Sequence, residues 1–143
     1  MADPFSITTG CVALAGTIVN ISTSITGFVK AFRAARSDLD AVSRELGSLQ
    51  TILGLIAEDA SKGGFPETLQ RQIEGIISNC SKVLEEIGHT LEKYDKLGNR
   101  RAAEWAFSGR ADVTKLTLSL EAHKTALELA LDMVQMCVLL AGA

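Results

Sequence analysis

The sequence predicts an all-α fold, an antiparallel bundle of four long helices with a short bracing helix before the last one. Apolar residues recur at steps of three and four along four long segments, and no segment shows strand alternation. The two prolines, Pro4 and Pro66, stand near segment starts. No segment can bury its apolar stripe alone, so we expect the four stripes to pack together. The whole chain, residues 1–143, is long enough for one domain.

The first segment predicts an unusually apolar helix. No charged side chain occurs from Pro4 to Val29, and the other faces carry Thr, Ser and Asn20, so helix propensity is modest and packing must stabilise the helix. About 28 helical residues span roughly 42 Å, which exceeds the roughly 30 Å hydrocarbon core of a bilayer. Its predicted buried seam consists of Ile7, Cys11, Leu14, Ile18, Ile21, Ile25, Phe28 and Phe32.

The second segment predicts an amphipathic helix with charged outer residues. Ser37 and Asp40 form a capping-box-like start, and the pattern continues until Gly63 and Gly64 stop it. The apolar stripe consists of Leu39, Val42, Leu46, Leu49, Leu53 and Ile56.

The third helix starts at Pro66, a residue favoured in the first turn, with Glu67 beside it. Gly98 and Asn99 are expected to end it. Its stripe consists of Leu69, Ile73, Ile76, Cys80, Val83, Ile87, Leu91 and Tyr94.

The stretch "RRAAEWAF" predicts a bracing element of two helical turns. It is expected to press Trp105 and Phe107 onto the bundle before Ser108 and Gly109 interrupt it. A last helix starts at Asp112 and runs nearly to the C-terminus. Its apolar positions are Val113, Leu116, Leu120, Leu127, Leu131, Val134 and Val138, broadened by Leu118, Leu129 and Leu139.

Composition and motifs argue against nucleic-acid binding and catalysis. The 14 basic and 17 acidic residues leave no basic surplus. Cys11, Cys80 and Cys137 are far apart and lie on apolar stripes, which predicts buried thiols in a reducing compartment. His89 and His123 lack metal-ligand spacing, and no phosphate loop or nucleophile motif occurs. We therefore expect no enzyme, cofactor, metal, nucleic acid or small-molecule substrate.

A helix without a charged outer face is enclosed by its neighbours, contacts a missing partner, or leaves the bundle for a membrane. The segment lacks the basic start of a signal peptide, and its Ser, Thr and Asn content is heavy for a permanent span. Lys30, Arg33 and Arg36 follow it and either offset the helix dipole or meet anionic headgroups. A second basic cluster is interpreted as solvated surface: Lys93, Lys96, Arg100 and Arg101.

Three stretches together carry a family resemblance: "MADPFSI", Trp105 ahead of a Gly/Arg-containing turn, and "LSLEAHKTALELAL" from Leu118 to Leu131. In this order they resemble the HeLo-like N-terminal domain of fungal STAND proteins, the NLR-type receptors, over essentially the whole chain. That domain is related to the four-helix bundle of the necroptosis executioner pseudokinase. The resemblance implies the N-terminal part of a longer receptor that acts in programmed cell death, heterokaryon incompatibility and innate immunity.

The resemblance further implies a cell-death or signalling domain that oligomerises and permeabilises membranes through its N-terminal helix. It would be cytoplasmic at rest and at the plasma membrane when activated, with further copies of itself and membrane lipids, including anionic lipids, as partners. Asp3 and Pro4 match the family's start, and His123, Lys124 and Leu127 match a last-helix pattern that we interpret as structural. The alternative is a soluble helical adaptor that recruits partners without membrane activity. The predicted membrane-targeting residues are Phe5, Ile7, Leu14, Ile18, Ile21, Ile25, Phe28, Lys30, Arg33 and Arg36.

Overall fold

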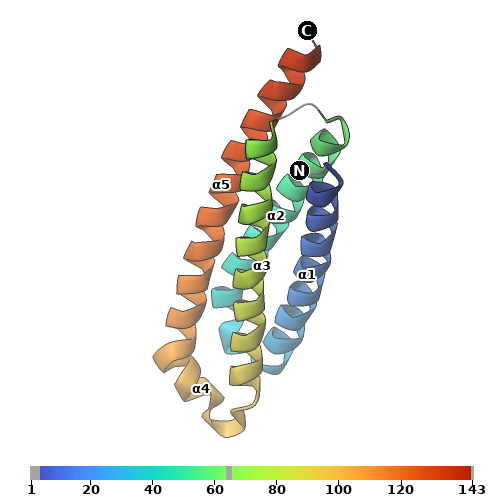
Figure 1. The fold of residues 1–143 in the computed structure, drawn as a ribbon. Coiled ribbons are helices and arrows are strands. Elements are labelled where there is room, and N and C mark those ends of the chain that lie inside the picture. The colour runs from blue at the N-terminus through green and yellow to red at the C-terminus, as the bar shows by residue number, and fades with distance from the viewer. Residues whose placement is uncertain (1–3, 64–65, 143) are drawn as a thin grey trace.

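The four long helices form an antiparallel bundle, which confirms the predicted fold class (Figure 1). The computed structural model describes residues 4–63 and 66–142. The long helices are α1 (Pro4–Ala31), α2 (Arg36–Ser61), α3 (Glu67–Asp95) and α5 (Arg110–Gly142). The shorter elements are the 3-10 turns η1 (Arg33–Ala35) and η2 (Gly98–Arg100), the short helix α4 (Arg101–Glu104) and the π-helical turn η3 (Trp105–Gly109).

Helices α1 and α5 lie at opposite corners of the bundle (Figure 1). Helix α1 packs against α2 and α3, and α5 packs against the same two helices from the other side. One face of α1 is therefore buried, while the opposite face is exposed. The first helix is a corner of the bundle rather than a central helix surrounded by the other three.

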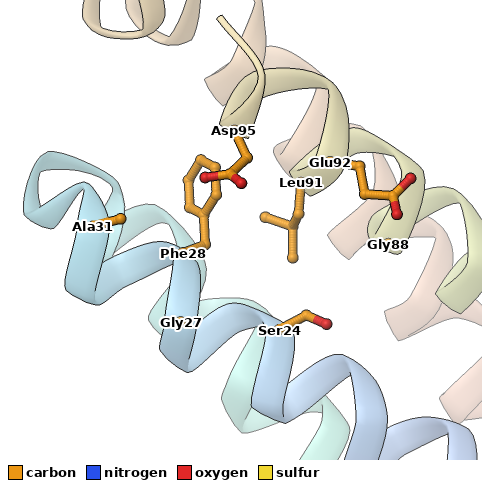
Figure 2. Close-up of a pocket in the computed structure, with 8 residues that line it drawn as sticks. All are labelled: Ser24, Gly27, Phe28, Ala31, Gly88, Leu91, Glu92 and Asp95. Carbon is orange, nitrogen blue, oxygen red and sulfur yellow. The ribbon is translucent and has the colours of Figure 1, made fainter. Parts of the chain in front are cut away.

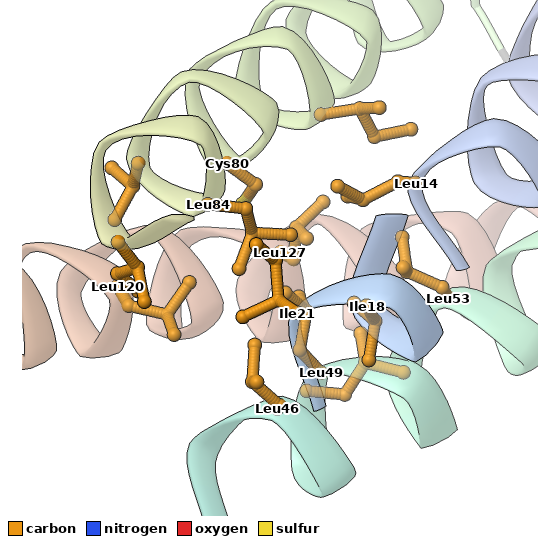
Figure 3. Packing of buried hydrophobic residues seen from close by; sticks show 14 of the residues in the cluster. Leu14, Ile18, Ile21, Leu46, Leu49, Leu53, Cys80, Leu84, Leu120 and Leu127 are labelled. Atoms are coloured by element: carbon orange, nitrogen blue, oxygen red, sulfur yellow. The ribbon is translucent and has the colours of Figure 1, made fainter. Parts of the chain in front are cut away.

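The core is built from the apolar stripes of all four helices. Figure 3 shows Leu14 of α1, Leu49 of α2, Leu84 of α3 and Leu127 of α5 converging in the middle of the bundle. Every predicted seam residue within α1 is buried, and Phe32, which follows the end of the helix, is half-buried. The helical period therefore predicts the buried face of α1 correctly.

The start of α2 differs from the prediction. The helix begins at Arg36, and its N-cap residue, Ala35, makes no side-chain cap hydrogen bond. The chain enters α2 directly from η1, so Ala35 already has helical rather than extended dihedral angles. An N-cap hydroxyl normally acts from an extended residue. The capping box predicted at Ser37 and Asp40 is therefore wrong.

The bracing segment runs into the last helix without a break. The predicted interruption at Ser108 and Gly109 is wrong, since η3 passes directly into α5, which begins at Arg110. Trp105 is buried as predicted, but the prediction for Phe107 is wrong because this side chain is 87% exposed. Positions two apart on a helix point about 200° apart, so only one of the two aromatic side chains can face the core.

Burial corrects two further predictions. On α3 Ile77 is fully buried and Ile76 only half-buried, so the stripe is shifted by one position there. Cys11 and Cys80 are buried as predicted, whereas Cys137 is half-buried because the last turns of α5 project past the neighbouring helices (Figure 1). Burial raises the pKa of both buried thiols to about 11, so they stay protonated at neutral pH.

Candidate functional site

From Thr9 to Gly27 the outward face of α1 is exposed and carries no charge. Among the described residues, one segment, Ile7–Ala31, is long and apolar enough to cross a membrane by length and composition. Only 28% of its most apolar window is buried, whereas a core helix would be mostly buried. Val12 and Val19 are 67% and 54% exposed on this face. The other exposed residues are small or polar: Thr9, Ala13, Gly16, Asn20, Thr23, Ser24, Thr26 and Gly27.

Hydroxyl groups on this helix bond to the helix itself. Thr17, Thr23, Ser24 and Thr26 each donate to the backbone carbonyl oxygen four residues earlier, at 3.0–3.2 Å. A hydroxyl bonded in this way needs neither water nor a lipid headgroup as a partner. The surface is therefore polar in composition yet compatible with an apolar environment.

Three exposed cations lie at the C-terminal end of this helix and just beyond it. Lys30 lies in the last turn of α1, Arg33 in η1 and Arg36 at the first position of α2. Within the described part of the chain none of the three forms an ion pair, whereas the nearby Arg101 and Arg110 each pair with an aspartate. Lys30 is also placed to offset the dipole at the C-terminus of α1. Arg33 and Arg36 remain accessible to an external anion.

Arg101 contacts the C-terminal end of α1 from the bracing segment. Its guanidinium carbon lies 5.9 Å from the ring centre of Phe28 and 5.3 Å from that of Phe32. Nη2 donates to the carbonyl oxygen of Ala31 at 3.5 Å, and Nη1 pairs with Asp95 of α3 at 3.1 Å. The side chain is 19% exposed, so its interpretation as a solvated surface cation is wrong.

Trp105 packs beneath the same end of α1. Its ring centre lies 5.3 Å from that of Phe28, 6.1 Å from Phe32 and 5.4 Å from Tyr94 of α3. Nε1 donates to Oδ2 of Asp38 on α2 at 2.9 Å. One indole thus joins the ends of three long helices. The Trp105 cluster is defined as Phe28, Phe32, Tyr94, Arg101 and Trp105.

A groove of about 440 Å³ lies between α1 and α3 beside the Trp105 cluster (Figure 2). Small residues of α1, including Ser24 and Gly27, line one wall, and Glu92 and Asp95 of α3 stand at the other (Figure 2). A second groove of about 340 Å³ lies between the same two helices, near Gly10. The contact between α1 and α3 is therefore interrupted by open space along its outer edge.

The two histidines lie on different helices. His89 is exposed on α3, and His123 is half-buried on α5. Residues 4–63 and 66–142 contain no group of three or more His, Cys, Asp or Glu side chains that could hold a metal ion.

The predicted membrane-targeting residues fall into two groups in the structure. The three cations are exposed together at one end of the bundle, while the apolar members face α2 and α3. The first-turn side chain of Phe5 lies outside what the structure describes, and Asp3 lies outside the described residues. Val12 and Val19, which do meet solvent, were missed because the seam pattern selects the opposite face. The buried members are Ile7, Leu14, Ile18, Ile21, Ile25 and Phe28.

Comparison with known proteins assigns the chain to a family. Residues 2–139 match the family described as "Pigment biosynthesis cluster protein PigL N-terminal". The chain belongs to the PigL N-terminal family. The match includes the whole of α2, α3 and the Trp105 cluster, so this PigL N-terminal domain is essentially the bundle itself. No curated protein and no solved structure matches the chain.

Proposed function

We propose that this domain is the membrane-targeting domain of a cell-death or signalling protein, inhibited as a closed bundle until copies cluster. On activation α1 leaves the bundle and inserts into the bilayer, with Lys30, Arg33 and Arg36 at the headgroups. The proposal includes the relationship to HeLo-like domains of fungal STAND proteins. It also includes movement from the cytoplasm to the plasma membrane. The observation that supports it most is an uncharged helix at a corner of the bundle, with one face exposed.

The corner position lowers the structural cost of releasing α1. A central helix would have to separate the other three helices from one another before leaving. Helix α1 has to separate only from α2 and α3, and the remaining contacts of α5 with those two helices are not interrupted. The open grooves between α1 and α3 further reduce the contact that must be broken.

Release still requires an energy source. Seven residues of the α1 seam, from Ile7 to Phe28, are buried. Full burial of one such side chain contributes roughly 1.5–3 kcal/mol, so the seam contributes about 10–20 kcal/mol. A bilayer restores burial of these side chains but not of the α2 and α3 residues that they cover. Clustering, in which neighbouring copies cover those uncovered faces, supplies the missing stabilisation.

The dimensions and chemistry of α1 suit insertion. The 25 residues of Ile7–Ala31 extend for about 38 Å as a helix, enough to cross a core of roughly 30 Å with some tilt. The self-bonded hydroxyls leave few unpaired donors to bury in lipid. The basic flank then lies at the membrane surface, where anionic lipid attracts it.

Leakage of dye from liposomes by forced oligomers of the purified domain tests the proposal. We expect Val19→Lys to abolish leakage, because Lys at the centre of a span costs about 2.5–3.5 kcal/mol, while the folded bundle tolerates a charge at this exposed position. The matched control is Leu55→Lys, on the exposed side of α2, which should leak like the unmodified domain. The proposal is refuted if clustered domains cause no leakage with or without anionic lipid, or if Val19→Lys leaks normally.

A second candidate is a soluble helical adaptor that recruits partners without membrane activity. Exposed leucine and methionine side chains on α5, including Leu129 and Met136, favour it because they form an apolar surface away from α1. An adaptor would bind partners equally well with Val19→Lys and would leave liposomes intact. The leakage assay therefore separates the two functions.

A further inference from the structure

The outer face of α5 is apolar and has no neighbour within the described chain. The α5 stripe is defined as Leu118, Leu129, Met133, Met136 and Leu140, which are 61%, 62%, 53%, 64% and 72% exposed. With Ala122 and Thr125 between them, these positions recur at steps of three and four, as in a helix that packs against another helix. A helix at the corner of a soluble bundle normally presents charged residues there.

We propose that the α5 stripe is a self-association surface through which two copies pair with their α5 helices parallel. A two-fold pair brings the same stripe from both chains together, so each apolar face covers the other. Five long apolar side chains, each more than half exposed, lie along one helix face, and apolar surface gathered in this way is often functional on soluble proteins. The last turns of α5 project past α2 and α3, so a second helix can approach them without obstruction (Figure 1).

A groove beside the stripe accommodates side chains from the second copy. It has a volume of about 420 Å³ and lies between α3 and α5, with Leu129 and Met133 on one wall and Ile76 on the other. Gly75 also lines it, and a Cβ atom built at Gly75 would meet nothing within 4 Å. Leucine and methionine side chains of a facing α5 therefore have space to enter, as knobs enter holes between packed helices.

Charges beside the stripe favour the parallel orientation. Glu121, Glu128 and Asp132 are exposed along the flank nearer α2, the side on which Lys124 pairs with Glu45 at 2.8 Å. In an antiparallel pair like flanks face each other, so the two acidic rows would repel. In a parallel pair each acidic row meets the partner's opposite flank. That flank borders α3 and carries charges of both signs: Lys115 and Glu86 line one groove, and Arg71, which pairs with Glu67 at 2.8 Å, lines the other. A mixed flank repels an acidic row less than a second acidic row does.

Parallel pairing also has a consequence for the membrane. A two-fold axis along the bundle turns the same end of both copies in one direction, so both sets of Lys30, Arg33 and Arg36 face one plane. This consequence rests on the proposed function, but the pairing itself does not. The pairing is therefore tested by molecular mass and cross-linking rather than by leakage.

The mass of the domain is measured by sedimentation equilibrium over a wide concentration range. We expect a monomer–dimer equilibrium that Leu129→Glu with Met136→Glu weakens more than about 100-fold, because each pair would bury uncompensated charges. Leu55→Glu on α2 is the matched control and should pair normally. At a concentration low enough for the monomer to dominate, circular dichroism should show an unchanged melting temperature for both variants, since all three positions are exposed.

Cross-linking tests the orientation. In a Cys137→Ser background, single Leu140→Cys and Met133→Cys variants should each form disulfide-linked dimers, because a parallel pair places equal positions opposite each other. An antiparallel pair centred near Met133 would cross-link only through that position. The proposal is overturned by a monomer at the highest soluble concentration, by undiminished pairing of the double Glu variant, or by cross-linking confined to Met133→Cys. Binding of the monomer to anionic liposomes through the stripe would identify lipid as the occupant and would also overturn it.

Discussion

Gly109 lies so close to the indole of Trp105 that a side chain at this position would overlap the ring. A Cβ atom at position 109 would lie 2.5 Å from Cε3 and 2.9 Å from Cδ2 of Trp105, well inside van der Waals contact. The indole has no room to retreat, because Phe28, Phe32 and Tyr94 surround it. Gly109→Ala should therefore displace Trp105 and loosen the end of α1.

The magnitude follows from opposing contributions to the free energy of unfolding. Replacing Gly by Ala within a helix stabilises by about 1 kcal/mol through backbone propensity. Overpacking costs typically 1–3 kcal/mol, and loss of the bond from Trp105 to Asp38 adds about 1 kcal/mol. We expect Gly109→Ala to destabilise the domain by about 2 kcal/mol. Gly75→Ala, with open space around its Cβ atom, should instead stabilise it by up to about 1 kcal/mol.

Urea unfolding followed by fluorescence measures both changes, since Trp105 is the sole tryptophan of the chain. Native Gly109→Ala should also emit at longer wavelength as the indole becomes hydrated. A double-mutant cycle followed by circular dichroism isolates the contact, because Gly109→Ala should cost nothing once Trp105→Ala has removed the ring. Stabilisation of the domain by Gly109→Ala, as expected for Gly75→Ala, or a destabilisation that persists without the indole, would contradict the clash with Trp105.

Two further predictions concern Arg101 and the buried thiols. Arg101→Ala should accelerate amide hydrogen exchange in the last two turns of α1, because the contacts of Arg101 with the Phe28 and Phe32 rings and with the Ala31 carbonyl are lost. Arg100→Ala, at an exposed neighbouring position, is the control and should leave this exchange unchanged. Equal exchange rates in the two variants would contradict a stabilising role for Arg101. The thiols of Cys11 and Cys80 have a pKa of about 11 in the folded domain, raised by burial from the ordinary value of 9.0 that applies to the unfolded chain. The contribution of these two thiols to the free energy of unfolding is fully present below pH 9. It is lost as the pH rises toward 11, because the thiols of the unfolded chain ionise at lower pH than those of the folded domain. Urea midpoints at about pH 8, 9 and 10 should fall less steeply in a Cys11→Ala, Cys80→Ala variant, and equal slopes would exclude the effect.

The local pattern of the chain is sufficient to predict the helices and their buried faces. Apolar steps of three and four define which side of α1 is buried, and the prediction holds from Ile7 to Phe28. Burial of Trp105 also follows from its place in a short apolar segment. The exact boundaries do not follow, because the chain enters α2 through a 3-10 turn that no capping residue marks.

Contacts between distant segments are what the pattern leaves open. Arg100 and Arg101 are adjacent and chemically identical, yet only Arg101 lies over the rings at the end of α1. The geometry of η2 decides which of the two points inward. The same holds for Phe107, which is as apolar as its buried neighbours but lies on the outer side of the π-helical turn.

Periodicity and composition are enough to predict four long helices and to show that the first carries no charge from Pro4 to Val29. The place of α1 at a corner diagonal to α5, with its neutral face exposed, follows from the packing of the helices, because four stripes of equal period do not specify which helices become neighbours. The contacts of Arg101 and Trp105 with the end of α1 were decided in the same way. The bond from Arg101 to Ala31 of α1 and the bond from Trp105 to Asp38 of α2 each join residues about 70 positions apart. Such pairs come together only when α1 and α2 have packed into the bundle beside the segment that follows α3, and helical periodicity carries no information beyond the helix in which it occurs.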